Sequence, residues 1–369
     1  MDIVLFSTAD FSFIRTRKQQ VAINLSKKGH RVLFIEPPRS GKWKNLPLTR
    51  HNLLKKISDN LFVYSPPVFP LMGKYSLINS LNYDFILFNI LKIVNKLDFR
   101  DITYWLYTLR GFKWIGKLSE KRVVFDSIEN WQYSNEEDSL KKKLPSFIKK
   151  SDIVFAPSTE IVDYCKKYNH KSFLIPHGVD PSYFKEYKEP DELKKIKRPI
   201  IGISASITAQ KFDINLVKEI AKKRPDWSIV IIGPILSGEN LDCFKDILNI
   251  HYLGEKDFDI LPAYVKQFDI GFIPFIVNKF TRCTRPLKMF DYIASGIPVV
   301  STRLLEYEDY KDFVKTADKT DDFIRIIEKE ITEDSPEKIR KRIETAKGFL
   351  WSKRVDSMLD IIMNGGKSV

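Results

Sequence analysis

A segment between residues 282 and 302 combines basic and polar side chains with the predicted start of a helix. It reads Arg282-Cys-Thr-Arg-Pro-Leu-Lys-Met-Phe-Asp-Tyr-Ile-Ala-Ser-Gly-Ile-Pro-Val-Val-Ser-Thr302. The residues at the helix start are Thr284, Arg285, Pro286, Leu287 and Lys288. A helix N-terminus has unpaired N–H groups and a partial positive charge, so it suits phosphate, and Asp291 one turn further on could hold ribose hydroxyls. The segment therefore predicts half of a nucleotide-diphosphate site.

A second cluster could serve the same ligand. Ser204-Ala-Ser206-Ile-Thr208-Ala-Gln-Lys211 follows an apolar run that we interpret as a strand. Small residues such as Ser206 let the backbone approach a ligand closely. Lys211 could neutralise a diphosphate. This cluster is weak evidence by itself and gains weight beside the segment at 282–302.

Three further groups of candidate residues lie in the first half of the chain. Arg15 and Arg17 stand in a polar loop after the first predicted strand, where they could face the phosphate of an acceptor or simply begin a basic helix. Asp126 and Glu129 follow another strand; this pair could orient or deprotonate a hydroxyl, whereas an Asp in this place often caps the next element. His177, beside a glycine, could contact a ligand phosphate or serve packing alone.

Alternating apolar runs and helical patterns position these residues. In the first half the predicted strands are Ile3–Ser7, Val32–Ile35, Leu61–Ser65, Arg122–Asp126, Ile153–Ala156 and Phe173–Ile175. In the second half they are Ile200–Ser204, Ser228–Ile232, His251–Leu253, Ile270–Ile273 and Val299–Val300. Helices are predicted over Arg15–Lys28, Ser76–Leu97, Ile214–Lys223 and Ser335–Met363, the last interrupted near Gly348. Strand–helix alternation predicts parallel, doubly wound α/β sheets.

Two such domains are predicted from this pattern and from the length of 369 residues. We expect a Rossmann-like acceptor domain over 1–184, a charged linker over 185–199, and a nucleotide-binding Rossmann-like domain over 200–346. The helix at 347–369 should pack back toward the first domain. Ligands of open α/β sheets bind at the carboxyl ends of the strands, so a cleft between the two domains is expected.

Composition narrows the function classes. With 43% hydrophobic and 29% charged residues the chain is globular rather than disordered. No apolar window is long enough for a spanning helix, the first residues resemble a strand rather than a signal peptide, and three cysteines suit a reduced cytoplasmic setting. Five scattered histidines indicate no metal site, and the absence of Gly-x-Gly-x-x-Gly argues against a simple dehydrogenase.

The net charge of +14 is concentrated in the first half. Residues 1–180 hold 29 Lys and Arg against 17 Asp and Glu. A basic half of this kind could bind nucleic acid, an anionic membrane or a diphosphate-bearing substrate. The alternative is that the lysines lie on solvated helix faces and bind no partner. Residues 68–118 are also rich in aromatics, which we assign mostly to the core. The alternative is a membrane-facing surface that combines them with Lys74, Lys92, Lys96, Arg110, Lys113 and Lys117.

Several motifs together resemble those of the GT-B glycosyltransferases, in particular the large retaining family that uses nucleotide-diphosphate sugars. They are Ile175-Pro-His-Gly-Val-Asp180, Ile231-Ile-Gly-Pro234, Tyr252-Leu-Gly254, Phe268-Asp-Ile-Gly-Phe-Ile-Pro-Phe275 and Pro286-Leu-Lys-Met-Phe-Asp-Tyr-Ile-Ala-Ser-Gly-Ile-Pro-Val-Val300. Arg17-Lys-Gln-Gln20 followed by Gly29-His-Arg-Val32 is similar to a subgroup that makes bacterial cell-surface polysaccharides of the teichuronic-acid type. The likeness is specific in the second half and loose between 40 and 120.

The resemblance implies roles for individual positions. Asp291 and Cys283 stand where the family has the two glutamates of its Glu-x7-Glu pattern, which contact ribose and sugar. The amides from Thr284 on and Lys288 would meet the diphosphate. Gly233, Leu253 and Gly254 would line the nucleotide, with Gly254 after the strand that faces the base. Ser206 and Lys211 fall near the family's basic phosphate-binding pair, although its usual Arg and Lys-Gly pattern is absent.

The resemblance thus implies transfer of a sugar from a nucleotide-diphosphate sugar to a glycan or lipid-linked glycan acceptor. Lys288, Arg285 and Lys211 would stabilise the leaving diphosphate, retention follows from the family alone, and Asp126 would be the base if the enzyme inverts. We expect no metal, no other cofactor and no nucleic acid partner, and a cytoplasmic protein that could bind the inner membrane surface peripherally. A nucleotide-sugar epimerase and a non-catalytic nucleotide-sugar-binding subunit remain as alternatives.

Overall fold

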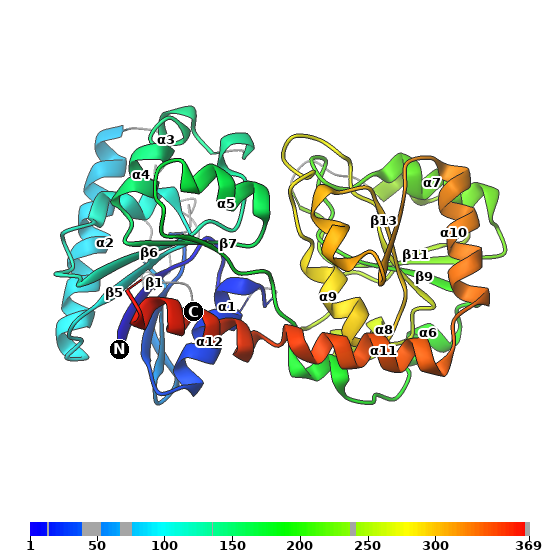
Figure 1. Cartoon of the computed structure of the whole chain (residues 1–369), viewed down its shortest axis with the longest axis horizontal. Helices are drawn as coiled ribbons and strands as arrows, with labels where there is room; N and C mark the ends of the chain where they lie inside the picture. The colour runs from blue at the N-terminus through cyan, green and yellow to red at the C-terminus, as the bar shows by residue number, and fades with distance from the viewer. Residues whose placement is uncertain (13–14, 39–52, 67–75, 135, 237–240, 366–369) are drawn as a thin grey trace, which may run out of the picture. The chain divides into compact units, whose positions relative to one another are not determined.

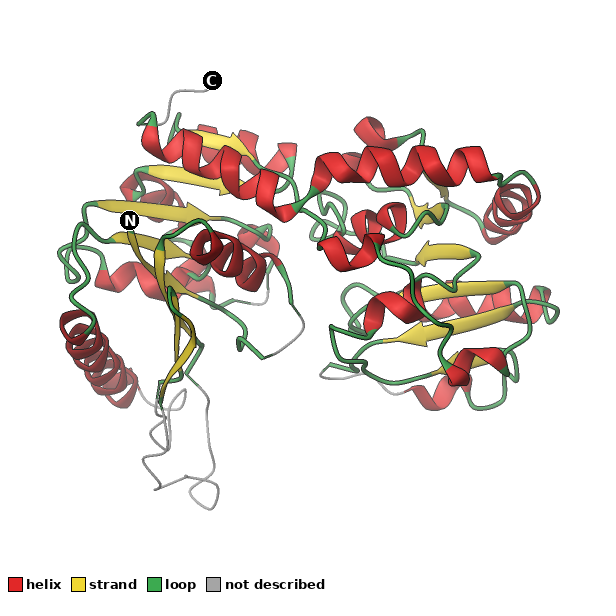
Figure 2. Ribbon diagram, turned by 90° about the horizontal axis from the view of Figure 1, so that it is seen from below, coloured by secondary structure: helices red, strands yellow, loops and turns green. Residues whose placement is uncertain are grey.

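The computed structural model describes residues 1–12, 15–38, 53–66, 76–134, 136–236 and 241–365, and the chain forms two compact units (Figure 1). Unit 1 contains Met1–Ala156, Ile161–Ile175 and Val355–Val369. Unit 2 contains Pro157–Glu160 and Pro176–Arg354. Each unit is built on its own sheet with helices on both faces (Figure 2).

The unit 1 sheet has eight strands in the order β3-β4-β2-β1-β5-β6-β7-β8. They are β1 (Asp2–Phe6), β2 (Arg31–Ile35), β3 (Leu54–Ser58), β4 (Leu61–Tyr64), β5 (Thr103–Leu106), β6 (Arg122–Asp126), β7 (Ile153–Ala156) and β8 (Ser172–Leu174). All neighbours pair in parallel except the edge hairpin β3–β4. The chain leaves β1 toward β2 on one side and returns to β5 on the other. The loops after β1 and β5 therefore lead away in opposite directions at the carboxyl edge of the sheet, where open α/β sheets bind ligands.

The described part of unit 1 has four longer helices and several short ones. The longer ones are α1 (Arg17–Lys27), α2 (Ser76–Lys96), α5 (Thr159–Lys166) and α12 (Trp351–Met363), of which the last begins in unit 2. The short ones are α3 (Asp138–Lys141), α4 (Leu144–Lys150), η2 (Leu109–Trp114) and η3 (Trp131–Tyr133). Gly29, with φ of +84°, ends α1 in the left-handed conformation that a glycine adopts without strain. The apolar faces of α2, α4 and α5 pack on the strands and enclose the unit 1 core.

The unit 2 sheet has six parallel strands in the order β11-β10-β9-β12-β13-β14. They are β9 (Ile200–Ser204), β10 (Ser228–Ile232), β11 (Ile250–Tyr252), β12 (Ile270–Ile273), β13 (Val299–Thr302) and β14 (Val314–Ala317). Because β9 is flanked by β10 and β12, the strand order reverses between β9 and β12. This reversal places the loops after β9 and β12 beside each other at the carboxyl edge.

Helices and 3-10 turns cover the unit 2 sheet. The helices are α6 (Asp191–Lys194), α7 (Ile214–Lys223), α8 (Leu261–Val265), α9 (Leu287–Ala294), α10 (Thr320–Thr332) and α11 (Pro336–Ala346). The 3-10 turns are η4 (Pro181–Phe184), η5 (Leu241–Phe244), η6 (Leu305–Tyr310) and η7 (Lys347–Phe349). Two buried clusters, one against each face of the sheet, form the core.

The α/β class and the two parallel-dominated sheets confirm the predicted fold class. The segment at 185–199 differs from the prediction, because it belongs to unit 2 and contains α6. The reason is local packing: Tyr183 and Leu193 are 1% exposed and join the unit 2 core. The predicted boundary at 184 therefore falls inside unit 2, and the division lies between Ile175 and Pro176.

The C-terminal helical segment is interrupted by η7, at the glycine where the sequence predicts a break. Beyond it, Val355, Met358 and Ile362 are fully buried, and residues 355 onward group with unit 1. Among the described residues, no helix combines the length and the hydrophobicity that a bilayer crossing requires.

Candidate functional site

The carboxyl edge of the unit 2 sheet carries most of the predicted nucleotide-site residues. The loops there follow β9, β10, β11 and β12, and α9 begins at the end of the last of them. Parallel strands bring these loops to one edge because all of their carboxyl ends point the same way. Residues that are up to 87 positions apart in the sequence, Ser204 and Asp291, therefore belong to the same edge.

Gly233 permits a close backbone approach between the loops after β9 and β10, and a hydrogen bond links it to Gly254 in the loop after β11. A Cβ atom on Gly233 would lie 2.0 Å from the carbonyl oxygen of Ala205, and the φ of Gly233 is +142°. The Gly233 amide donates to the Gly254 carbonyl at 3.0 Å, and the Tyr252 hydroxyl donates to the Gly233 carbonyl at 2.9 Å. The structure thus brings Gly233 and Gly254 together at this edge of the sheet.

The loop after β9 is tied to the loop that leads into α9. The amide of Ile276 donates to the carbonyl of Lys211 at 2.8 Å, and the Asn278 side chain donates to the Gln210 carbonyl at 2.9 Å. The Lys211 ammonium lies 5.0 Å from the centre of the Phe280 ring. Lys211 and the segment at 282–288 are therefore neighbours, although more than 70 residues separate them in the sequence.

Helix α9 is fixed against the sheet by its apolar side. Gly271 of β12 leaves space for Tyr292, whose ring a Cβ atom on Gly271 would approach to 2.4 Å. The Tyr292 hydroxyl accepts a hydrogen bond from the Ser204 amide at 2.7 Å. At the other end, Arg342 donates to the Gly296 carbonyl at 2.8 Å. These contacts fix the C-terminal half of α9. At its start, Pro286 at the N-cap provides no side-chain hydrogen bond to the first amides.

Lys288 and Asp291 lie one turn apart on α9, with the Lys288 ammonium 3.3 Å from the Asp291 carboxylate. Asp291 is only 4% exposed. Burial raises the pKa of Asp291 to about 6, against the opposing attraction of Lys288, and the nearby Asp180 carboxylate raises this pKa further while Tyr183 lowers it. The Lys288 side chain is 21% exposed and that of Asp291 6% exposed, so the lysine is the more accessible member of the pair.

Two members of the same segment are enclosed by protein. Arg285 is 2% exposed, and its guanidinium donates to the Glu306 carboxylate at 2.7 Å and lies 3.5 Å from Asp309. Cys283 is 1% exposed, with its sulfur 3.8 Å from the Phe280 carbonyl. The Arg285 charge is therefore buried and paired with Glu306, and Lys288 is the more accessible of these two cations. Thr284 stays partly exposed and donates to the Phe280 carbonyl at 3.3 Å.

In unit 1, Asp126 and Arg17 form a buried ion pair. Both are at most 1% exposed, and the Arg17 Nε donates to the two carboxylate oxygens at 3.0 and 2.9 Å. The Arg17 Nη1 donates to the Ile175 carbonyl at 2.6 Å. This arrangement joins α1, β6 and the end of β8. Both charged groups are therefore buried and paired with each other, a structural arrangement that differs from the exposed acceptor contact expected of Arg17 and the unpaired base expected of Asp126.

The other predicted residues of the first half remain at accessible places. Arg15 precedes α1 in the loop after β1, and Glu129 follows β6; both are partly exposed. His177 belongs to unit 2, where its ring lies 6.1 Å from the Trp351 ring and its carbonyl accepts from Arg354 at 3.2 Å. Gly178 beside it packs so closely that a Cβ atom would lie 2.8 Å from Trp351.

Solved structures of similar shape identify the fold. Sucrose-phosphate synthase from Thermosynechococcus elongatus superposes with a TM-score of 0.77 at 12% identity, over 99% of this chain and 98% of that one. Anabaena HepE in complex with UDP-glucose superposes with a TM-score of 0.72 at 13% identity, over 99% of this chain and 100% of that one. The chain has the GT-B fold.

Sequence comparison adds one relative of this GT-B chain. It is 26% identical over 219 residues to Bacillus subtilis (strain 168) TuaH, which is assigned by name to teichuronic acid biosynthesis as a glycosyltransferase. The match covers 54% of this chain and 55% of TuaH, so it spans about half the length of that relative. Comparison with protein-family models finds no match.

The structure of the GT-B chain also adds residues that the sequence did not single out. Tyr183 is 1% exposed and lies at Asp291, and Glu306 neutralises Arg285. Tyr183 follows closely after the motif that contains His177, which was the available signal; nothing in the sequence around Glu306 pointed to Arg285. Within the described residues, no group of three or more His, Cys, Asp or Glu side chains is arranged to hold a metal ion.

Proposed function

We propose that this chain is a glycosyltransferase that moves a sugar from a nucleotide-diphosphate sugar to a hydroxyl group of a glycan or lipid-linked glycan in cell-surface polysaccharide synthesis. The observation that carries the proposal is the start of α9 at the carboxyl edge of the unit 2 sheet, where Lys288 and Asp291 lie together. The GT-B fold and the partial similarity to TuaH support it. The similar HepE structure holds UDP-glucose, which supports a nucleotide-sugar donor.

The donor site is assigned to unit 2. The first amides of α9 and the Lys288 ammonium take the diphosphate, because both favour negative charge at the same place. Asp291, one turn further on, accepts hydrogen bonds from ribose hydroxyls once it is ionised. Lys211 and Ser206 approach from the loop after β9. Gly233, Leu253 and Gly254 are assigned to the nucleotide side, where the two glycines add no side chain.

Catalysis is assigned mainly to charge stabilisation. When the bond from the sugar to the diphosphate breaks, negative charge grows on the leaving phosphate oxygens. A lysine and helix amides that are already in place stabilise that charge without reorganising during the reaction. No step is assigned to Asp126 or Arg285, since each is buried in its own ion pair. Arg15 and Glu129 remain the candidates for acceptor contacts, and His177 for a ligand contact.

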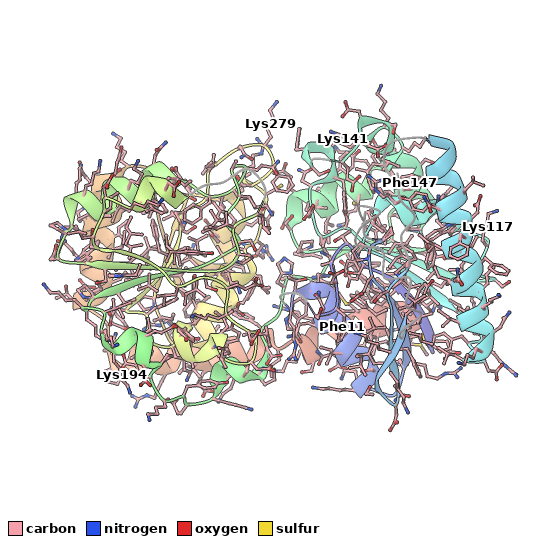
Figure 3. The ribbon with its side chains drawn as sticks, turned by 180° about the vertical axis from the view of Figure 1, so that it is seen from behind. Phe11, Lys117, Lys141, Phe147, Lys194 and Lys279 are labelled. Carbon is pink, nitrogen blue, oxygen red and sulfur yellow. The ribbon has the colours of Figure 1, made fainter. Side chains whose placement is uncertain are left out.

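Nucleotide release with different donors tests this proposal. The protein is incubated with UDP-, GDP-, ADP- and dTDP-sugars, with and without polysaccharide acceptor fragments, and free nucleotide is quantified. Acceptor-dependent release that is lost in Lys288→Ala and kept in Lys279→Ala supports transfer. Lys279 is a matched control because it is an exposed lysine on the same loop (Figure 3). Sugar interconversion without an acceptor would indicate an epimerase, and binding without turnover would indicate a non-catalytic subunit.

A further inference from the structure

Helix α2 carries a stripe of large apolar side chains on its exposed side. Leu81, Phe85 and Phe88 are 62%, 39% and 53% exposed. Their spacing of four and then three residues puts them on one face of the helix, and Lys92 continues that face. The opposite face enters the unit 1 core through Ile86, Ile90 and Val94. Exposed phenylalanines in adjacent turns are unusual for a surface that meets only water, and they mark an interaction site.

Cations are mixed into this apolar stripe. The Lys92 ammonium lies 4.2 Å from the centre of the Phe88 ring, and the Lys113 ammonium lies 3.1 Å from the Tyr83 ring of the same helix. Lys117, labelled in Figure 3, follows η2, whose Trp114 ring lies 5.8 Å from the Tyr83 ring of α2 between ring centres. Within the described part of the chain, Lys96 and Lys117 form no ion pair.

The acidic side chains near α2 offset only part of this charge. Asp84 is exposed on the helix and attracts Lys113. Glu120 is engaged by the backbone, since it accepts hydrogen bonds from the amides of Gly116 and Leu118. Residues 76–121 contain seven Lys and Arg against four Asp and Glu, and of these cations Arg110 is paired with Glu136 and Glu137 from outside the range. The stripe is therefore apolar at its centre and positively charged around it.

We propose that the exposed face of α2, formed by Leu81, Phe85, Phe88 and Lys92, docks unit 1 on an anionic lipid surface. A helix of this kind lies in the plane of the interface, where the rings enter the boundary between headgroups and acyl chains and the lysines meet lipid phosphates. A second copy of this chain is a poorer occupant, because a symmetric contact through this face would bring like-charged lysines together. The proposal does not depend on the donor site in unit 2.

Vesicle binding of the full chain tests it. Partitioning is measured by flotation with vesicles of pure phosphatidylcholine and with vesicles containing phosphatidylglycerol. We expect binding to the anionic vesicles that declines with salt. The double variant Phe85→Ser/Phe88→Ser should bind the anionic vesicles at least about tenfold more weakly, because burial of each ring in the lipid contributes strongly to the free energy of partitioning. Leu248→Ser is the matched control, because Leu248 is 92% exposed in unit 2 and should leave binding unchanged.

A conservative variant keeps the test independent of folding. Phe88→Trp retains an aromatic ring, and its additional emission should shift to shorter wavelength with anionic vesicles and stay unshifted with neutral ones. Equal binding of the double serine variant and the original chain, binding to both kinds of vesicle alike, or no binding to either would overturn the proposal. A further contrary result would be a dimer of the original chain, detected by light scattering, that is absent in the double serine variant while neither protein binds vesicles. That result would assign this face to contact with a second copy of the chain.

Discussion

Asp291→Asn is expected to stabilise unit 2 at neutral pH. The wild-type carboxylate is buried at 4% exposure, and the enclosure raises its pKa to about 6 from an ordinary value of 3.8. Asparagine has nearly the same shape and carries no charge, so it resembles the protonated carboxyl. The substitution therefore removes two opposing contributions: the cost of burying a negative charge and the attraction of that charge to Lys288. The raised pKa already reflects the sum of both.

The size of the effect follows from proton linkage. Between pH 4 and 6 the folded state binds more protons at Asp291 than the unfolded state, so the free energy of unfolding falls as the pH rises. Below pH 4 this contribution is fully present, and it is lost as the pH passes through about 6. The difference between 3.8 and about 6 corresponds to about 3 kcal/mol. Asp291→Asn should thus match the wild type near pH 4 and exceed it by up to about 3 kcal/mol at pH 7.

Calorimetric unfolding across this pH range is the assay. Two units need not unfold together, so the transition of unit 2 is followed separately. Asp318→Asn is the control, because that side chain is 62% exposed and its replacement should change little at any pH. A stability gain for Asp291→Asn that is the same at pH 4 and pH 8 would refute the linkage argument. A loss of stability at pH 7 would show that contacts of the ionised carboxylate outweigh its burial.

Three further substitutions test separate parts of the structure. Lys288→Ala should weaken nucleotide-diphosphate binding by at least about 1.5 kcal/mol, because a charge-assisted hydrogen bond is lost; unchanged calorimetric affinity would exclude Lys288 from the site. Asp126→Asn should lower the free energy of unfolding by about 3 kcal/mol, since Arg17 stays buried without its counter-charge; a loss below about 1 kcal/mol in urea titration would argue against a buried pair. Gly233→Ala should cost about 2 kcal/mol, because its methyl group would meet the Ala205 carbonyl and its φ is unfavourable for alanine; an unchanged melting temperature would contradict this.

Most strands were predictable because they are short apolar runs bounded by turn residues. Ile200–Ser204, Ser228–Ile232 and Ile270–Ile273 have the predicted ends, as expected for strands buried on both faces. By contrast, β5 lies in a stretch so rich in aromatics that its pattern could not be separated from helix. Strand β14 contains a lysine at a sheet edge and gives little apolar signal. Lys74, part of the predicted membrane-facing set, lies outside the described residues.

Sequence alone predicts only the part of the candidate donor site that lies within one continuous segment. The helix start with Lys288 and Asp291 is visible in one segment of the sequence. The partners that decide which charges remain free come from elsewhere: Arg17 and Asp126 are 109 positions apart, and Arg285 and Glu306 are 21 apart. Sequence alone suggests three cations for the diphosphate, and folding removes Arg285 from them. Such pairings arise from the tertiary contacts between elements and not from spacing along the chain.

Unit 1 is built from sequence ranges at both ends of the chain, and this affects the order in which the two units fold during synthesis. Its sheet is complete once β8 has been made, but three fully buried core residues, Val355, Met358 and Ile362, are translated only after all of unit 2. The ion pair between Lys28, which directly follows α1, and Asp356 of α12 also forms only after unit 2 has been made. Domains that are contiguous in the sequence fold as they emerge from the ribosome. We therefore expect unit 2 to reach its native state first. Until the C-terminal residues have been made, unit 1 should remain incomplete, and part of its apolar surface should be accessible to chaperones.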